Sequence, residues 1–169
     1  TIAVSNDVNA CQGSVVRVVA NATDNSSLLW TTQGDGTFLD PTDSRADYTP
    51  GPQDILAGSV TLTATALSAF GCPQDEDSMV LSIIPYPVAE AGTTVETCGN
   101  EPAQLSGVAT GSSSVLWTTA GDGIFNNNTI PNATYTPGPA DLLAGSINLT
   151  FTAYGNAPCA DTSDYMTVS

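Results

Sequence analysis

The chain contains the stretch WTTQGDG at residues 30–36 and repeats it as WTTAGDG at residues 117–123, 87 positions downstream. The same offset relates YTPGP at residues 48–52 to residues 135–139, and LAGS at residues 56–59 to residues 143–146. Self-similarity at a fixed period sets the architecture, and a period of this length fits a small complete domain rather than a solenoid unit. The chain of 169 residues therefore consists of two tandem copies of one domain. This duplication argues against a single asymmetric active site.

Short runs of Val, Ile, Leu and Thr, separated by turn residues, predict β-strands in each copy. In the first copy we expect strands at residues 2–4, 15–20, 28–32, 46–49, 60–66 and 79–84. The clearest alternation, apolar on one face and threonine on the other, lies at residues 60–66 and keeps its phase at 147–153. The only helical signal is a proline-started turn at residues 52–57 and 139–144, closed by glycine. Many short strands at this spacing predict an all-β fold of two β-sandwiches.

The sequence Pro85-Tyr86-Pro87 marks the predicted boundary between the copies, which gives domains at residues 1–86 and 87–169. Two prolines make a short, stiff connection, so we expect a semi-rigid arrangement. The second copy ends at Ser169, which maps onto Ser82. We therefore expect a unit of a longer array. A related alternative is a filament subunit whose last strand pairs with residues 1–4 of the next molecule, since unpaired sheet edges accept added strands.

The chain has four cysteines, and the common offset maps Cys11 onto Cys98 and Cys72 onto Cys159. Four cysteines allow three connectivities, and the offset favours one bridge within each copy, Cys11–Cys72 and Cys98–Cys159. Each bridge would close a loop of roughly 60 residues and stabilise a small domain by about 4 kcal/mol. Four free buried thiols are the alternative. Disulfides indicate an oxidising compartment, hence an extracellular or cell-surface location.

The charge balance excludes several classes of function. The net charge is −15, with two arginines, no lysine and no histidine. Nucleic acids and anionic membranes both need a basic footprint, so we expect neither as a partner. Catalytic triads need a histidine and Schiff bases need a lysine, and we predict no catalytic residues and no enzyme. No segment is apolar enough to span a membrane, and any export signal or anchor would lie outside this chain.

The Gly-Asp-Gly triplets centred on Asp35 and Asp122 predict tight turns, in which glycine supplies positive φ and aspartate binds nearby amides. The alternative is a Ca²⁺ ligand at each aspartate, because hard cations take carboxylate oxygens. No series of aspartates at calcium-loop spacing is present, so we expect no resident cofactor and treat Ca²⁺ as the alternative. Other acids that would share a cation are Asp40, Asp43, Asp47, Asp75, Glu76, Asp77 and Glu90.

Two aromatic pairs and one acidic pair recur at the same offset. Trp30 and Trp117 lie in apolar strands and predict the core tryptophan of a sandwich, with an exposed sugar-stacking platform as the alternative. Asp54 and its copy Asp141 are expected to accept amide bonds in the first turn of the short helix. Tyr48 and its copy Tyr135 are expected to bury the ring and donate the hydroxyl to backbone at a corner.

The tryptophan, the Gly-Asp-Gly triplet and the later strand GSVTLT at residues 58–63 stand in the order of the PKD and immunoglobulin-like superfamily of surface-protein repeats, which this sequence resembles. The fuller phrase, which adds YTPGP and LAGS, is similar to tandem repeats of very large Bacteroidetes surface adhesins of the gliding-motility type. The resemblance covers nearly the whole chain and implies two immunoglobulin-like (PKD-like) β-sandwiches. It implies a stalk or fibre outside the cell rather than a particular ligand.

Two kinds of glycosylation signal are present. Ser78, in Asp77-Ser78-Met79, is similar to the short motif that Bacteroidetes use for O-glycosylation. Asn-x-Ser/Thr sequons begin at Asn21, Asn25, Asn127, Asn132 and Asn148. In a secreted eukaryotic chain these sequons would be surface glycan sites, whereas in a bacterial chain this rich in Asn, Ser and Thr chance is the better explanation.

We therefore predict structural repeat modules of an extracellular bacterial adhesin or fibre, whose partners are neighbouring copies of the repeat or surface glycans. The alternative is a carbohydrate-binding module accessory to a secreted polysaccharide-degrading enzyme. That alternative requires one surface lined by exposed aromatic side chains, namely Phe38, Phe70, Tyr86, Phe125, Tyr154 and Tyr165.

Overall fold

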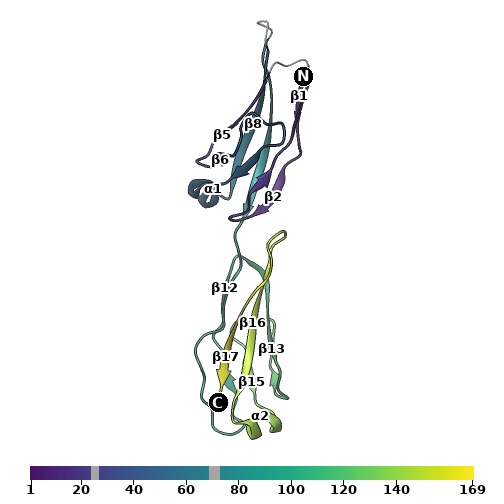
Figure 1. Ribbon diagram of the computed structural model, residues 1–169. Helices are drawn as coiled ribbons and strands as arrows, with labels where there is room; N and C mark the ends of the chain where they lie inside the picture. The colour runs from purple at the N-terminus through teal and green to yellow at the C-terminus, as the bar shows by residue number, and fades with distance from the viewer. Residues whose placement is uncertain (24–26, 69–72) are drawn as a thin grey trace. The chain divides into compact units, whose positions relative to one another are not determined.

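Figure 1 shows the computed structural model, which describes residues 1–23, 27–68 and 73–169. The chain divides into two compact units, Thr1–Pro85 and Tyr86–Ser169, each with its own apolar core. The sequence had placed the boundary one residue later, between Tyr86 and Pro87. No described helix is long and apolar enough to cross a membrane.

The first unit is a β-sandwich. Its larger sheet has the strand order β2 (Val8–Cys11), β9 (Asp75–Ile84), β8 (Ser59–Leu67) and β5 (Ser27–Thr32). Its other layer consists of β3 (Val16–Arg17), β7 (Asp47–Thr49) and β6 (Thr37–Phe38), together with the pair β1 (Ile2–Val4) and β4 (Ala20–Ala22). Strand β2 runs parallel to β9, and the other pairs are antiparallel. Helix α1 (Pro52–Ala57) joins β7 to β8, as predicted.

The second unit repeats this plan. Its larger sheet consists of β13 (Ser112–Thr119), β16 (Ile147–Gly155) and β17 (Thr162–Val168). The other layer consists of β11 (Ala103–Gln104), β15 (Thr134–Thr136) and β14 (Ile124–Phe125), with the pair β10 (Val88–Glu90) and β12 (Val108–Thr110). Helix α2 (Pro139–Ala144) precedes β16. The counterpart of β2 is reduced to one parallel bridge, Val95 to Val168.

The alternation of apolar and polar residues in the sequence decides which side chains face the core. In β8, Val60, Leu62 and Ala64 are buried, while Thr61 and Thr63 stay partly exposed on the outer face. Trp30 and Trp117 are 2% and 0% exposed, and each indole N–H donates to a backbone carbonyl, at 3.2 and 3.1 Å. The tryptophans therefore fill the cores of their own units.

The single strand expected at residues 15–20 is two strands. Val16–Arg17 pairs with β7, and Ala20–Ala22 pairs with β1. Between them the Val18 amide bonds to the Ala46 carbonyl at 2.9 Å. The chain thus changes partners within one extended segment, because both ends of that segment bury apolar side chains in the same core.

The predicted Cys98–Cys159 bridge is wrong, because Cys98 is an exposed free thiol. The segment before Cys98 lies beside the end of β17, where the Thr97 amide donates to the Ser169 carbonyl at 2.8 Å. Cys159 lies in the loop that joins β16 to β17, at the opposite end of this hairpin. Seven residues of β17 separate the two ends by roughly 20 Å, whereas a bridge needs Cα atoms within about 7 Å. The second unit therefore lacks the expected intradomain disulfide.

Disulfide bonding does occur in this chain. Cys11 and Cys159 are both disulfide-bonded. Cys72, which the sequence paired with Cys11, lies outside the described residues.

Candidate functional site

The feature that both units build most completely is a buried carboxylate between the Gly-Asp-Gly turn and the short helix. In the first unit this is Asp54, 2% exposed, at the third position of α1. Its carboxylate accepts the Tyr48 hydroxyl at 2.6 Å and the Gly51 amide at 3.0 Å. It also accepts the amides of Asp35 and Gly36, at 3.2 and 3.1 Å. Four donors thus converge on one buried anion.

Asp35, the aspartate of the turn, accepts hydrogen bonds from the helix in turn. The Asp35 carboxylate accepts the amide of Gln53 at 3.0 Å and that of Asp54 at 3.3 Å. These are amides of the first helical turn, which have no partner inside the helix. Asp35 therefore caps the helix while Asp54 closes the turn. We call the set Asp35, Tyr48 and Asp54, with its counterpart Asp122, Tyr135 and Asp141, the aspartate corner.

The second unit has the same corner. Asp141, 5% exposed, accepts the Tyr135 hydroxyl at 2.5 Å and the amides of Gly138 and Gly123 at 3.1 and 3.0 Å. The Asp122 amide donates to it at 3.3 Å. The Asp122 carboxylate in turn accepts the amides of Ala140 and Asp141, at 3.1 and 3.3 Å. One sequence phrase therefore produces one hydrogen-bond network twice.

The glycines of the turn are required for space rather than for positive φ. The glycines with positive φ do not include Gly34 or Gly36, so that part of the turn prediction is wrong. A Cβ on Gly34 would collide with the Asp54 carboxylate, and one on Gly36 with the Tyr48 hydroxyl. A Cβ on Gly51 would collide with the Asp35 carboxylate. Close approach of backbone to a buried anion is the reason for glycine at these positions.

Two predicted roles change in the structure. The first-turn amides that we assigned to Asp54 bind Asp35 instead. Asp54 accepts the amide of Gly51, the residue before the helix, and the turn amides of Asp35 and Gly36. The Tyr48 ring is buried as expected, but its hydroxyl binds the Asp54 carboxylate and the Thr32 hydroxyl, the latter at 3.0 Å. The sequence did not predict the hydrogen bonds between the Gly-Asp-Gly turn and the helix, because no local pattern relates residues that lie 18 or 19 positions apart.

The corner shifts the ionisation of its members. Burial opposes ionisation of Asp54, yet donation by Tyr48, Gly51, Asp35 and Gly36 outweighs it, so the pKa of this carboxyl is lowered. The pKa of Asp141 is lowered by the same balance. Burial, and then the hydrogen bond to Asp54, raises the pKa of Tyr48 to about 12. Burial likewise raises the pKa of Tyr135. The corner is therefore an anionic carboxylate held by neutral donors.

Calcium binding at Asp35 and Asp122 stays a prediction. Both carboxylates already accept two helix amides each. Residues 1–23, 27–68 and 73–169 contain no group of three His, Cys, Asp or Glu side chains that could hold a metal. Of the other acids considered, Asp47 pairs with Arg17 at 2.8 Å. Asp75 and Asp77 accept the amides of Ile2 and Val4, at 3.0 and 2.8 Å.

The glycosylation candidates lie on the surface where they are described. Ser78 is exposed on β9, and its hydroxyl is 2.9 Å from the Thr63 hydroxyl of β8. The exposed sequon asparagines are Asn21, Asn127, Asn132 and Asn148. Asn25 lies outside the described residues. Accessibility is satisfied at these positions, and modification stays a prediction.

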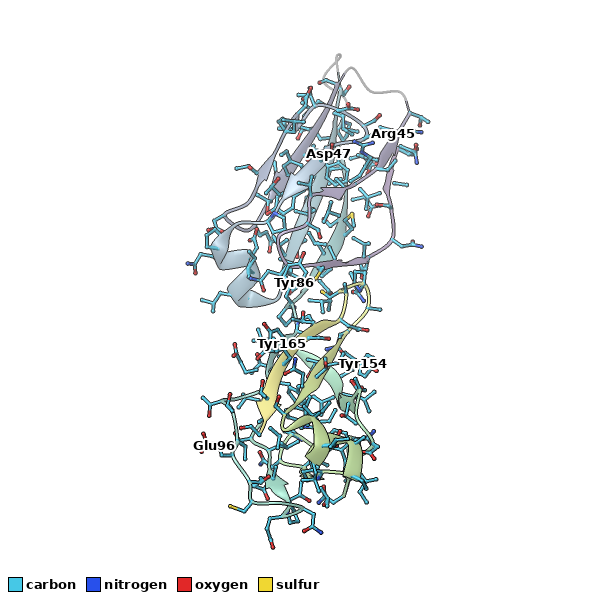
Figure 2. All side chains as sticks on the ribbon, turned by 60° about the horizontal axis from the view of Figure 1, so that its bottom comes forward. Arg45, Asp47, Tyr86, Glu96, Tyr154 and Tyr165 are labelled. Atoms are coloured by element: carbon cyan, nitrogen blue, oxygen red, sulfur yellow. The ribbon has the colours of Figure 1, made fainter. Side chains whose placement is uncertain are left out.

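The aromatic residues do not form one surface. Phe38 packs between Trp30 and Tyr48, with ring centroids 5.9 and 4.8 Å away. Phe125 packs on Tyr135 in the same way, at 4.9 Å. The exposed rings are Tyr165, at 69%, and Tyr86, at 52%; both are labelled in Figure 2, together with the partly exposed Tyr154. Phe70 lies outside the described residues. Phe38 and Phe125, two of the six rings that a sugar platform would need, therefore pack against the cores instead.

Comparisons with known proteins identify the fold. No protein-family model matches the chain, and no curated protein matches it. Among solved structures, the chain is similar to titin domains I67–I69, with a TM-score of 0.56 and 14% identity, over 98% of this chain and 62% of that one. It is also similar to Sidekick-1 immunoglobulin domains 1–5, with a TM-score of 0.51 and 16% identity, over 99% of this chain and 39% of that one. The predicted fold class, tandem immunoglobulin-like β-sandwiches, is confirmed.

Proposed function

We propose that this chain provides structural repeat modules of an extracellular bacterial surface adhesin or fibre, and that its work is to carry load and resist unfolding. The observation that carries the proposal is the aspartate corner. Both units place a buried anion and its donors between a turn and a helix, with distances that agree from copy to copy. Mutual hydrogen bonding among a buried carboxylate, a tyrosine hydroxyl and backbone amides stabilises a scaffold, and this supports a structural role.

The charge and cysteine chemistry support the same proposal. A net charge of −15 favours solubility of an exposed polypeptide. Disulfide-bonded cysteines fit an oxidising compartment outside the cytoplasm. Tandem immunoglobulin-like sandwiches suit a spacer, in which each unit has its own core and neighbours are copies of the repeat. The chain spans 62% and 39% of the solved structures named above, so the activity of the whole protein belongs to this proposal.

A filament version of the proposal depends on strand exchange through residues 1–4. In this structure β1 pairs with β4 of its own unit, and two of its amides bind Asp75 and Asp77. Exchange would have to release all of these bonds before another molecule could use the strand. The stalk version needs no such step and is the one we favour.

Single-molecule force measurements test the load-bearing role. Under reducing conditions, each unit should unfold in one cooperative event that releases roughly 30 nm of chain, because an extended residue spans about 3.3–3.6 Å. Asp54→Ala should lower the unfolding force of one event and leave the other unchanged. The matched control is Glu96→Ala, at an exposed acid outside the corner. Gradual extension without discrete events, or an Asp54→Ala force equal to that of the control, would overturn the proposal.

A carbohydrate-binding module remains the second candidate. Tyr154 and Tyr165 both lie on the outward face of the sheet formed by β13, β16 and β17. A glycan array separates the candidates. Binding that is lost in Tyr165→Ala would favour the module, whereas an array without binding favours the stalk.

A further inference from the structure

One face of the second unit, which the structure describes in full, carries no charged side chain. Strands β13, β16 and β17 form a sheet whose inner face buries Leu149, Phe151 and Ala153 in the core. The residues that alternate with these face outward. The outward residues are Ser114, Leu116, Thr118, Asn148, Thr150, Thr152, Tyr154, Ser163, Tyr165 and Thr167. We call this set the neutral face.

The neutral face contrasts with the acidity of the rest of the unit. The fully described second unit has seven acids and no base, and none of the seven belongs to the neutral face. These acids are Glu90, Glu96, Glu101, Asp122, Asp141, Asp161 and Asp164. Asp164 lies within β17, but its carboxylate accepts the Ala91 amide at 2.8 Å on the other side of the sheet. Asp161 lies in the loop before β17 and accepts the Gly155 amide at 2.9 Å. Like charges repel, so two copies of this unit can approach most closely where neither presents a charge.

The hydroxyl groups of the neutral face bind partners on neighbouring strands. The Thr152 and Ser163 hydroxyls are 2.8 Å apart, and the Thr167 hydroxyl donates to the Asn148 side-chain oxygen at 2.9 Å. A polar group that keeps a partner on its own sheet loses less when water is excluded than a group left without one. Another protein surface can therefore cover this face at a small polar cost. A site that recognises sugar hydroxyls would instead need polar groups free to bind them.

Exposed apolar surface on the same face favours such burial. Tyr165 is 69% exposed and lies opposite Thr150 of β16, and Leu116 and Tyr154 are partly exposed on the same face. Tyrosine is enriched at protein interfaces, because its ring buries apolar area while its hydroxyl keeps a hydrogen-bond partner. Tyr154 lies four residues from Thr150 along β16, roughly 13 Å away. The two tyrosines therefore do not stack on one sugar ring.

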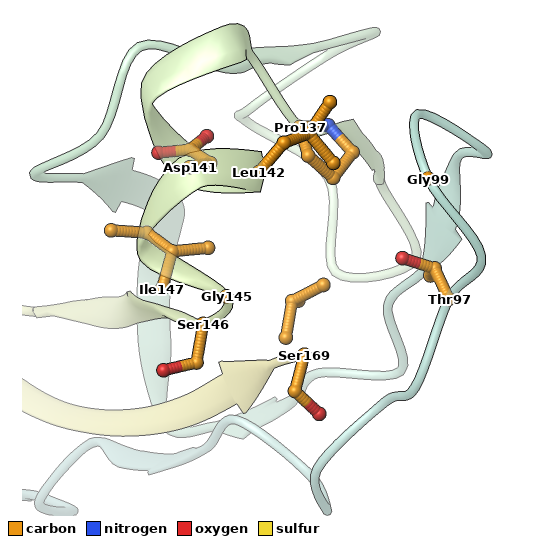
Figure 3. A pocket seen from close by; sticks show the side chains of 10 residues that line it. Thr97, Gly99, Pro137, Asp141, Leu142, Gly145, Ser146, Ile147 and Ser169 are labelled. Carbon is orange, nitrogen blue, oxygen red and sulfur yellow. The ribbon is translucent and has the colours of Figure 1, made fainter.

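The neutral face is an open surface of modest size. Ile147, which precedes Asn148, packs against the core and borders a hollow of about 340 Å³ with Asp141 and Leu142 of α2 (Figure 3). None of the described residues of the neutral face lines that hollow, so the face is a sheet surface rather than a cleft. Three strands with seven paired rows cover roughly 350 Å², at a strand spacing of about 4.8 Å and a rise of about 3.4 Å per residue. A stable dimer buries at least about 600 Å² per partner, so a contact through this face alone is weak.

We propose that the neutral face is a homotypic contact surface, at which the second units of two copies of this chain pack sheet against sheet. A twofold axis brings the face against itself, and Tyr165 of each copy fills the space between two sheets about 10 Å apart. The contact adds side-by-side association to the stalk. It uses no residue of the aspartate corner, so the force measurement and a measurement of self-association can fail separately.

Sedimentation equilibrium of the intact chain measures this association. All proteins carry Cys98→Ser, which prevents cross-linking through the exposed thiol, and EDTA prevents divalent cations from bridging acids. We expect a monomer–dimer equilibrium with a dissociation constant of roughly 0.1–1 mM. Association should strengthen between about 0.02 and 0.5 M salt, because salt screens the repulsion between copies. Association that weakens over this range would indicate a contact between charged groups and would overturn the proposal.

A charge placed on the face tests where the contact lies. Tyr165→Asp should weaken association at least about tenfold, because each copy would bury a carboxylate without a partner. Ser78→Asp is the matched control, since Ser78 holds the same position in the first unit. Leu143→Asp is a second control, because Leu143 is 91% exposed on α2, outside the neutral face. Equal weakening by Tyr165→Asp and either control would overturn the proposal.

Amide NMR spectra at increasing protein concentration map the contact without a substitution on the face. The signals of Thr150 and Tyr165 should shift, while those of their first-unit counterparts Thr63 and Ser78 should stay in place. Spectra that stay unchanged up to about 2 mM, or shifts confined to other strands, would contradict the homotypic contact. A chain that stays monomeric and binds neutral glycans through Tyr165 would also overturn it, and would assign the face to a sugar.

Discussion

The two repeats agree where polar atoms are buried and differ where they are exposed. The Tyr–Asp bond of the corner measures 2.6 Å in the first repeat and 2.5 Å in the second. At an exposed edge, the first repeat has the ion pair between Arg17 and Asp47, while the second has Gln104, whose amide donates to carbonyls including that of Ala133 at 3.2 Å. A buried anion without donors is strongly unfavourable, whereas an exposed pair contributes little. Each sandwich therefore requires the buried hydrogen bonds of the aspartate corner, whereas the contacts at the exposed edge can vary.

The largest expected effect comes from removing the buried carboxylate. Asp54→Ala leaves the Tyr48 hydroxyl and three backbone amides without this acceptor, and should lower the free energy of unfolding of the first repeat by about 3–5 kcal/mol. Asp141→Ala should do the same in the second repeat. Each repeat has one tryptophan, so indole fluorescence during urea unfolding, in Trp30→Phe or Trp117→Phe backgrounds, assigns each transition. A loss below that of Glu96→Ala would show that the corner does not stabilise the fold.

The next largest difference is expected between the two cysteines of the second repeat, Cys98 and Cys159. Cys159→Ser removes a disulfide-bonded residue and should reduce the free energy of unfolding, because the bridge restricts the unfolded chain. Cys98→Ser should leave stability unchanged, because that thiol is free and exposed. Alkylation without reductant, followed by peptide mass analysis, should modify Cys98 and spare Cys159. Modification of Cys159 instead would contradict this assignment.

The corner should make stability fall at both ends of the pH range. The folded pKa values of Asp54 and Asp141 lie below the ordinary value, so their contribution is present above about pH 4 and is lost as pH falls through the folded pKa. Tyr48 has a raised pKa, so its contribution is complete below pH 10 and is lost as pH rises from 10 to about 12. Tyr48→Phe should remove the alkaline loss in the first repeat only. An alkaline profile that this variant leaves unchanged would assign the loss to another group.

The smallest effect should come from the exposed edge. Arg17→Gln gives the first repeat the residue type that the second has at Gln104, and Gln104→Arg makes the reverse exchange. Each should change the melting temperature less than any variant above, and the Arg17→Gln difference should vanish at about 1 M salt, where the Debye length is roughly 3 Å. A large, salt-independent loss in Arg17→Gln would mean that the pair is structural.

The fold class, the short helices and the alternating strands could be read from sequence because they depend on local patterns. Pro52 with Gly58 predicted α1, and the alternation at Val60 and Leu62 predicted β8. Strand β2 was missed because its residues Val8–Cys11 alternate poorly, with two exposed and two buried in succession. Its place in the sheet comes from a parallel pairing with Leu81–Ile84, which no short-range signal encodes.

The residues of the candidate site could be predicted from the sequence, but their hydrogen-bond partners could not. The repeated phrase identified Asp35, Tyr48 and Asp54 as a set, but not which carboxylate would receive which amide. The exchange of roles between Asp35 and Asp54 depends on where the turn meets the helix after packing. The Cys98–Cys159 pairing failed for a related reason, since a constant offset says nothing about which end of a hairpin each cysteine occupies.

The sequence by itself determined that there are two copies, that both are β-sandwiches, and which residues each copy keeps. The repeat, the alternation and the turn glycines can be read directly from the order of residues, without knowledge of contacts between distant residues. The tertiary structure decided the reciprocal bonding of Asp35 and Asp54, the free state of Cys98 and the parallel pairing of β2 with β9. Each of these depends on distances between residues far apart in the chain, and such distances exist only once the core has packed.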